Sequence, residues 1–210
     1  GIAQQFVIVG ESDGGELVWV MIDGNKASGI TPHHLELPVL AATGTVALEF
    51  DRFVATDAEV MTIVDATEWR ATDRLSSSIG QTAALGVAER AVSILRSPTE
   101  HGVANDLDVG DACAALLVQL TDRWADDDRF VSEMSEPIDD RETWIRRASR
   151  HRARCLEVSR TATTVLLAAS GGSGLNLSHP AQRLAREALF YVIQAQTADG
   201  RSATIRSVAS

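Results

Sequence analysis

The spacing of apolar residues changes once along this chain, from a period of two to a period of about 3.6, near residue 72. Before that point, apolar side chains alternate or run together in short segments rich in Val, Ile and Trp, which is typical of β-strands. After it, they recur at steps of three and four over long stretches, which is typical of amphipathic helices. Strands first and helices after favour an α+β fold over alternating βαβ units.

Strands are expected throughout the N-terminal part. The segments "QFVIVG" (5–10) and "ELVWVMID" (16–23) flank "ESDGG", whose Asp and Gly residues accept the positive φ angles of a tight hairpin. In "GTVALEFDRFVA" (44–55), alternating apolar residues give a strand one face to bury. The Gly- and Pro-containing segment 24–38 is expected to be a loop with a short extended piece.

Helices follow, beginning with two whose apolar stripes are regular. The first is expected over residues 74–96 and includes Ile79 in its apolar stripe. The second begins near Val109 and is expected to end at the acidic run of Asp126, Asp127 and Asp128, which is interpreted as a solvated helix end. Neighbouring carboxylates on one turn point in different directions, so this run does not predict a cation site.

The last two helices are the most strongly patterned. One runs from Trp144 to Ala169, with His151 on its apolar stripe as a hydrogen-bonded packing residue, and the other opens at Pro180, which a first helical turn tolerates. Four helices with short connections predict an up-down bundle. The expected architecture is a partial antiparallel β-domain over residues 1–70 and a four-helix bundle over 71–210.

Composition limits the classes of partner. A formal net charge of -10 argues against binding to nucleic acid or to an anionic membrane surface, and no run of 18 apolar residues predicts a membrane span. Cys113 and Cys155 lie on helical apolar stripes and are expected to be buried, reduced thiols of a cytoplasmic protein. No CxxC or HExxH spacing occurs, so no metal site is expected.

A glycine-rich break, "GGSG" at residues 171–174, separates the last two helices. It can be a plain helix-to-helix corner. It can also be a place where exposed backbone amides, together with the positive end of the next helix, meet a phosphate or pyrophosphate. The spacing alone leaves both interpretations open.

The segment from this break onward, "GGSGLNLSHPAQRLAREALFYVIQAQTADGR" (171–201), resembles the C-terminal end of the acyl-CoA dehydrogenases. Upstream, "VALEFDRFVAT" (46–56) resembles the end of that family's β-domain, and residues 72–95 resemble the first helix of its C-terminal bundle. The resemblance covers nearly all of the chain and implies that it is the C-terminal portion of something longer. The matching residues of the final segment are Gly171, Gly172, Gly174, Pro180, Arg183, Leu184, Arg186, Ala188 and Thr197.

The resemblance implies a chemistry, the α,β-dehydrogenation of acyl-CoA thioesters with FAD in fatty acid or lipid metabolism. In this family a carboxylate removes the α-proton while a hydride leaves the β-carbon for the flavin. By the same resemblance, Gly171, Gly172 and Thr197 are expected to bind FAD, acyl-CoA is the expected substrate, and the helical bundle is expected to form a homo- or hetero-oligomer.

The catalytic base is where the sequence departs from the family. The usual Glu position falls in "QAQT" and is Ala195, which cannot take a proton. A minority of the family carries the base directly before an Arg at the start of the first bundle helix, and here that pair is Asp73 and Arg74. Asp at a helix start is also a favoured capping residue, so both interpretations of Asp73 stay open. The family's Arg-x-x-Phe-Gly motif after that helix has no counterpart.

Four hypotheses follow for the function. The chain is a non-catalytic partner in a hetero-oligomeric acyl-CoA dehydrogenase, or a self-sufficient dehydrogenase that uses Asp73 as base. Alternatively, it is a flavin-dependent monooxygenase of related fold, which needs no carboxylate base, or a structural bundle without flavin.

Overall fold

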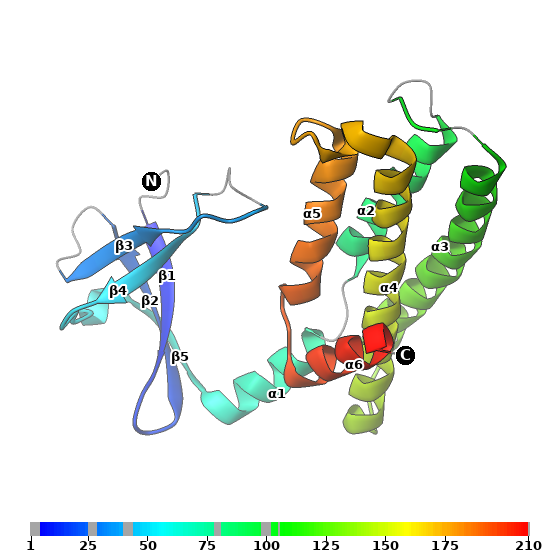
Figure 1. The fold of residues 1–210 in the computed structure, drawn as a ribbon. Coiled ribbons are helices and arrows are strands. Elements are labelled where there is room, and N and C mark those ends of the chain that lie inside the picture. The colour runs from blue at the N-terminus through cyan, green and yellow to red at the C-terminus, as the bar shows by residue number, and fades with distance from the viewer. Residues whose placement is uncertain are drawn as a thin grey trace. The chain divides into compact units, whose positions relative to one another are not determined.

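The structure is a computed structural model that describes residues 5–24, 29–39, 44–77, 81–97, 102–104 and 106–209 (Figure 1). The chain forms two compact units, Gly1–Asp73 and Arg74–Ser210. The first is built mainly from strands and the second from helices, which confirms the predicted α+β fold.

The first unit holds two antiparallel sheets. The three-stranded sheet has the order β1-β2-β5, and β3 pairs with β4 in a sheet of two strands. The predicted hairpin joins β1 and β2 through a turn in which Gly15 takes a φ of 79°, and the predicted short extended piece is β3. The strands are β1 (Gln5–Glu11), β2 (Glu16–Asp23), β3 (Ile30–His34), β4 (Val46–Phe50) and β5 (Val60–Asp65).

Helix α1 (Ala66–Ser76) follows β5 directly and starts against the three-stranded sheet. The Ala66 amide donates to the Gly15 carbonyl at 3.0 Å, and the rings of Trp19 and Trp69 lie 5.8 Å apart. Arg70 forms an ion pair with Glu11 of β1. These contacts hold the beginning of α1 to the first two strands.

The prediction of one helix over residues 74–96 is wrong. Helix α1 begins earlier and ends at Ser76, and a second helix, α2, runs from Thr82 to Arg96 after an N-cap at Gln81. The sequence at this break, from the last residue of α1 to Gly80, holds three consecutive serines and a glycine, which have lower helix propensity than Ala or Leu. The predicted stripe residue Ile79 lies outside the described residues.

Four helices of the second unit alternate in direction and form the predicted up-down bundle (Figure 1). Helix α4 is central, because it packs against α2, α3, α5 and the additional short helix α6. Its buried side chains, including Cys155, Ala162 and Leu166, join those of the other three in one apolar core. The helices are α2 (Thr82–Arg96), α3 (Leu107–Met134), α4 (Arg141–Ser170), α5 (Pro180–Ile193) and α6 (Ala198–Ala209).

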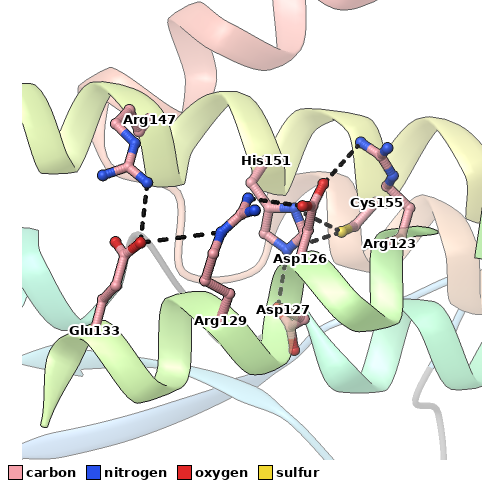
Figure 2. A network of polar contacts seen from close by, with 8 residues as sticks. All are labelled: Arg123, Asp126, Asp127, Arg129, Glu133, Arg147, His151 and Cys155. Atoms are coloured by element: carbon pink, nitrogen blue, oxygen red, sulfur yellow. Dashed lines mark hydrogen bonds and ion pairs between the residues drawn. The ribbon is translucent and has the colours of Figure 1, made fainter. Parts of the chain in front are cut away.

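The acidic run in α3 is not a helix end, contrary to the prediction. Helix α3 continues through it to Met134, and two of its three carboxylates, Asp126 and Asp127, are paired (Figure 2). Asp126 lies 2.7 Å from Arg129 and 3.5 Å from Arg123, pairs at helical spacing that support the helix. Asp127 is buried against α4 and is not solvated.

The long helices begin at side-chain caps. Asp106 accepts from the Val109 amide at the start of α3, and Asp140 accepts from the Thr143 amide at the start of α4, each at 3.0 Å. Among the described helices, none is both long enough and apolar enough to cross a membrane.

Candidate functional site

The glycine-rich break forms a corner at the end of α4. Gly171 ends the helix with a φ of 55°, which favours glycine, and a short 3₁₀ turn (Gly171–Leu175) follows. A Cβ added at Gly171 or Gly172 would meet no atom within 4 Å. At Gly174 it would lie 3.1 Å from the Ser170 Cβ and 3.3 Å from the Leu167 carbonyl oxygen. Close packing therefore favours glycine at position 174, whereas there is open space beside Gly171 and Gly172.

The corner leads into the N-terminus of α5. Pro180 occupies the first turn, as predicted, and the ring of His179 caps the helix by accepting from the Ala181 amide at Nδ1, over 3.2 Å. Histidine is an unusual N-cap, so sequence reasoning did not identify it. The Gly171 amide itself donates to the Ala168 carbonyl at the end of α4. What the corner offers an anionic group is exposed backbone at Gly171 and Gly172, shortly before the positive end of α5.

The other end of α5 is a second bend, formed by residues 194–197. Ala195 is exposed and takes a φ of 47°, a left-handed conformation that is uncommon for alanine. Thr197 is half-buried, and its Oγ1 accepts from the Gly200 amide at 3.2 Å, which caps α6. At this bend, Ala195 therefore presents a methyl group, and the hydroxyl oxygen of Thr197 accepts the hydrogen bond that caps α6.

A buried arginine holds this second bend in place. Arg152 of α4 is 4% exposed and donates through Nη2 to the carbonyl oxygens of Tyr191 and Gln194. Burial lowers the pKa of its guanidinium, and its Nε has no hydrogen-bond partner. A Cβ at Gly200 would lie 3.5 Å from the Arg152 Cδ, an ordinary van der Waals contact, so α6 packs directly against this arginine. Sequence reasoning missed Arg152. The one feature of the sequence that could have indicated its burial is its place between His151 and Ala153, which are both buried.

Asp73 does not begin a helix. The start of α1 is capped instead by Asp65, whose Oδ1 accepts from the Glu68 amide at 2.8 Å, and Asp73 lies half-buried in a later turn. The N-cap interpretation of Asp73 is therefore wrong. Its role as a base stays a prediction.

The neighbour of Asp73 links three helices. The Arg74 Nε lies 2.6 Å from Asp199 in the first turn of α6, and its two terminal nitrogens lie 2.5 and 2.9 Å from the Glu142 oxygens of α4. Hydrogen bonds from Arg74 lower the pKa of both carboxyls. The end of α1 is thus tied to the helix that Thr197 caps.

A buried polar cluster lies deeper in the bundle, at His151 (Figure 2). Its Nε2 is 3.0 Å from Asp127 Oδ1 and 3.4 Å from Cys155 Sγ, and Thr82 donates to Asp127 Oδ2 at 3.3 Å. The ring also stacks on Phe130, with centroids 5.0 Å apart. The predicted role of His151 as a hydrogen-bonded packing residue is confirmed.

Cysteine, histidine and aspartate at these distances resemble a nucleophilic triad, but burial argues against that chemistry. None of Asp127, His151 and Cys155 is more than 4% exposed. Burial raises the pKa of the Cys155 thiol, which keeps it protonated and unreactive. Cys113 is also buried and free, with its pKa raised by the same cause. Within the described ranges, no group of three His, Cys, Asp or Glu side chains could hold a metal ion.

Comparison with known proteins gives matches only at the level of structure. No model of a known protein family matches the chain, and no curated protein matches it in sequence. Among solved structures, glutaryl-coenzyme A dehydrogenase in its glutaryl-CoA complex superposes with a TM-score of 0.72 at 14% identity over 99% of this chain. Butyryl-CoA dehydrogenase from Megasphaera elsdenii gives 0.71 at 15% identity over 99% of the chain. The ChsE4-ChsE5 complex from Mycobacterium tuberculosis gives 0.67 at 18% identity over the same share.

The match is to part of each of those proteins. The chain spans 54%, 57% and 55% of their respective lengths, somewhat more than half. The chain therefore has the fold of the C-terminal portion of an acyl-CoA dehydrogenase.

Proposed function

We propose that this chain is the C-terminal portion of an acyl-CoA dehydrogenase-like flavoprotein subunit. Residues 1–70 are then the end of its β-domain and residues 71–210 its C-terminal bundle. The observation that carries the proposal is the superposition on glutaryl-coenzyme A dehydrogenase along 99% of this chain. The gapless sequence resemblance through the glycine corner supports it independently.

Within that assignment, we propose that the chain is the non-catalytic partner of a hetero-oligomer. Removal of the α-proton of an acyl thioester requires a positioned base. At the position where the resemblance expects that base, Ala195 offers an exposed methyl group. A subunit that supplies only bundle surface can lose the base, because its partner provides a complete site. The ChsE4-ChsE5 complex, which superposes on this chain, shows two differently named chains in one assembly of this fold.

The glycine corner is the part of the chain that fits an FAD cofactor. The open space above Gly171 and Gly172 lets a pyrophosphate approach their backbone, and the start of α5 adds a favourable dipole. Thr197 is the third proposed contact. FAD, when bound, supplies the acceptor for the substrate hydride. The proposed contribution of this chain is a backbone that an anionic group can approach. Proton transfer is not part of that contribution, because Ala195 has no group that accepts a proton.

Apolar side chains on and before α5 support assembly through the bundle. Leu189 and Ile193 lie one helical turn apart on α5 and are 61% and 70% exposed, and Leu175 and Leu177 of the corner are equally uncovered. Exposed apolar residues are typical of a surface that another subunit covers. Leu175 and Leu177 belong to the corner, so a partner that covers them would also reach the proposed cofactor contact.

Purification of the natural protein from its source tests the assignment. We expect a flavin absorbance band and native masses that include a second, different subunit. Dehydrogenation of acyl-CoA should require that second subunit. A homogeneous, active homo-oligomer would rule out the partner role, and material without flavin would favour a structural bundle.

The remaining dehydrogenase hypothesis uses Asp73 as base. Replacing it in the natural assembly, Asp73→Asn, should leave flavin reduction by acyl-CoA unchanged if this chain is the non-catalytic partner. The matched control is Asp128→Asn, an exposed carboxylate on α3. Loss of flavin reduction in the first variant alone would assign the base to Asp73 and overturn the partner role.

A further inference from the structure

A groove of about 220 Å³ lies between α4 and α6, away from the glycine corner. Arg150 and Arg154 line it from α4, and Arg206 lines it from the last turn of α6. Two small side chains, Ala153 and Ala203, are buried beneath and leave the hollow open. No ion pair or side-chain hydrogen bond joins any of the three arginines to another residue of the described ranges.

The arrangement is unfavourable for the helix that carries it. Arg150 and Arg154 are four residues apart, and Arg146 precedes them by the same step, so three like charges lie along one stripe of α4. Like charges at this spacing destabilise a helix. Elsewhere in the bundle arginines face carboxylates, as Arg147 faces Glu133 at 3.0 Å (Figure 2). The groove therefore concentrates positive charge that the protein itself does not neutralise.

The Glu157 carboxylate lies at the edge of the groove, where it accepts from the hydroxyl of the lining residue Ser207 at 2.8 Å. Glu157 makes no ion pair with a described arginine, so it leaves the three cations of the groove unpaired. Because the whole chain carries a formal charge of -10, this cluster of three cations is a local feature that runs against the general charge. An anion attracted here is attracted by the groove and not by the protein as a whole.

We propose that this groove binds the phosphate or pyrophosphate group of a small phosphorylated molecule. Guanidinium groups bind phosphate oxygens through paired hydrogen bonds, and three converging arginines can do so from both sides of the groove. Its volume is below the roughly 300 Å³ at which pockets for whole small molecules begin. The groove thus fits one anionic group and leaves the rest of the ligand in solvent.

The site stands apart from the proposed FAD contact. None of Gly171, Gly172 and Thr197 lines the groove. Its test needs no flavin, so its failure would leave the flavoprotein assignment unaffected.

Calorimetric titration of the 210-residue chain with inorganic pyrophosphate tests the proposal. At about 20 mM salt we expect saturable binding with one site, weakened severalfold at about 200 mM salt because exposed charges are screened. Citrate, an anion of similar charge built from carboxylates, should bind at least fivefold more weakly. Absence of binding by pyrophosphate would overturn the proposal, and equal binding by citrate would overturn the phosphate assignment.

A pair of double variants locates the site. Arg150→Gln with Arg206→Gln removes one cation from each wall, and we expect at least a tenfold loss of pyrophosphate affinity. The control, Arg160→Gln with Arg201→Gln, removes one exposed cation from each of the same helices outside the groove and should change affinity less than twofold. Equal losses in the two variants would mean general electrostatic attraction and would overturn the proposal.

A measurement on the unmodified sequence keeps the test independent of variant folding. Pyrophosphate should protect Arg150, Arg154 and Arg206 from phenylglyoxal, read by peptide mass spectrometry, and should leave Arg160 and Arg201 reactive. Uniform reactivity at all five arginines, with and without pyrophosphate, would contradict a site in the groove.

Discussion

The two ends of α5 are both bends between helices, yet they differ in what they leave accessible. At the first, Gly171 and Gly172 leave the backbone open and His179 caps the next helix. At the second, Arg152 holds the carbonyl end of α5 and Thr197 caps α6. An approach to backbone needs only glycine, so the first bend can serve a ligand without any side chain. A base needs a side chain with a proton acceptor, and Ala195 at the second bend offers only a methyl group.

The substitution with the largest expected effect on the free energy of unfolding removes the side chain that holds the second bend. Replacing Arg152 by Met removes its hydrogen bonds to the carbonyl oxygens of Tyr191 and Gln194. We expect a loss of about 2–3 kcal/mol in the free energy of unfolding, the range for hydrogen bonds that involve a charged group. Urea unfolding followed by circular dichroism measures it.

The control is Arg160→Met on the same helix, where the side chain is exposed and donates to no carbonyl group of the described residues. It should change the free energy of unfolding by less than about 0.5 kcal/mol. Equal effects of the two substitutions would show that Arg152 does not hold the bend.

The next largest effect is a difference in stability between two glycine substitutions in the first bend. Gly174→Ala places a Cβ 3.1 Å from Ser170 and 3.3 Å from a carbonyl oxygen, so we expect about 1–2 kcal/mol of destabilisation from overpacking. Gly172→Ala adds its methyl group in open space and should cost less than about 0.5 kcal/mol. Thermal unfolding of both variants measures the difference. The opposite order would mean that the corner is packed differently.

The bundle shows which helices their own pattern can predict. Helix α4 has a long apolar stripe and a glycine at its end, and α5 has Pro180 in its first turn, so both were predicted nearly at their observed limits. The continuation of α3 depends on partners, since Asp126 is paired with arginines and Asp127 with His151 of α4. The local sequence shows that these residues are charged, but it does not show which residues of other helices they contact.

The candidate site shows the same division. The glycine corner was identifiable because Gly171 has a backbone conformation that few other residues adopt. Arg152 was not, because arginine on a helix is usually exposed and only the fold buries it against the end of α5. The groove of Arg150, Arg154 and Arg206 likewise joins residues that are distant in the sequence.

A smaller effect, of opposite sign, concerns Ala195. Its φ of 47° is a conformation that glycine adopts without strain, and its side chain is exposed, so Ala195→Gly should stabilise the protein by about 0.5–1 kcal/mol. The control, Ala125→Gly on an exposed position inside α3, should destabilise by about 1 kcal/mol. Urea unfolding of both variants gives the signs. Destabilisation by Ala195→Gly would mean that the bend is not strained at this residue.

The smallest effect depends on pH and concerns the ion pairs that tie α6 to the rest of the bundle. Arg74 lowers the pKa of Asp199 and of Glu142 below their ordinary values of 3.8 and 4.5. A carboxyl whose pKa is lower in the folded state adds stability above its unfolded pKa and loses it as the pH falls through the folded value. Arg74→Gln should therefore lower the melting temperature at about pH 7, and the difference from the unmodified chain should shrink steadily below about pH 4. The control, Arg141→Gln, removes an exposed cation with no ion-pair partner among the described residues and should show no such convergence. A difference in melting temperature that stays constant down to about pH 2 would show that Arg74 stabilises the bundle by packing and not through these two carboxylates.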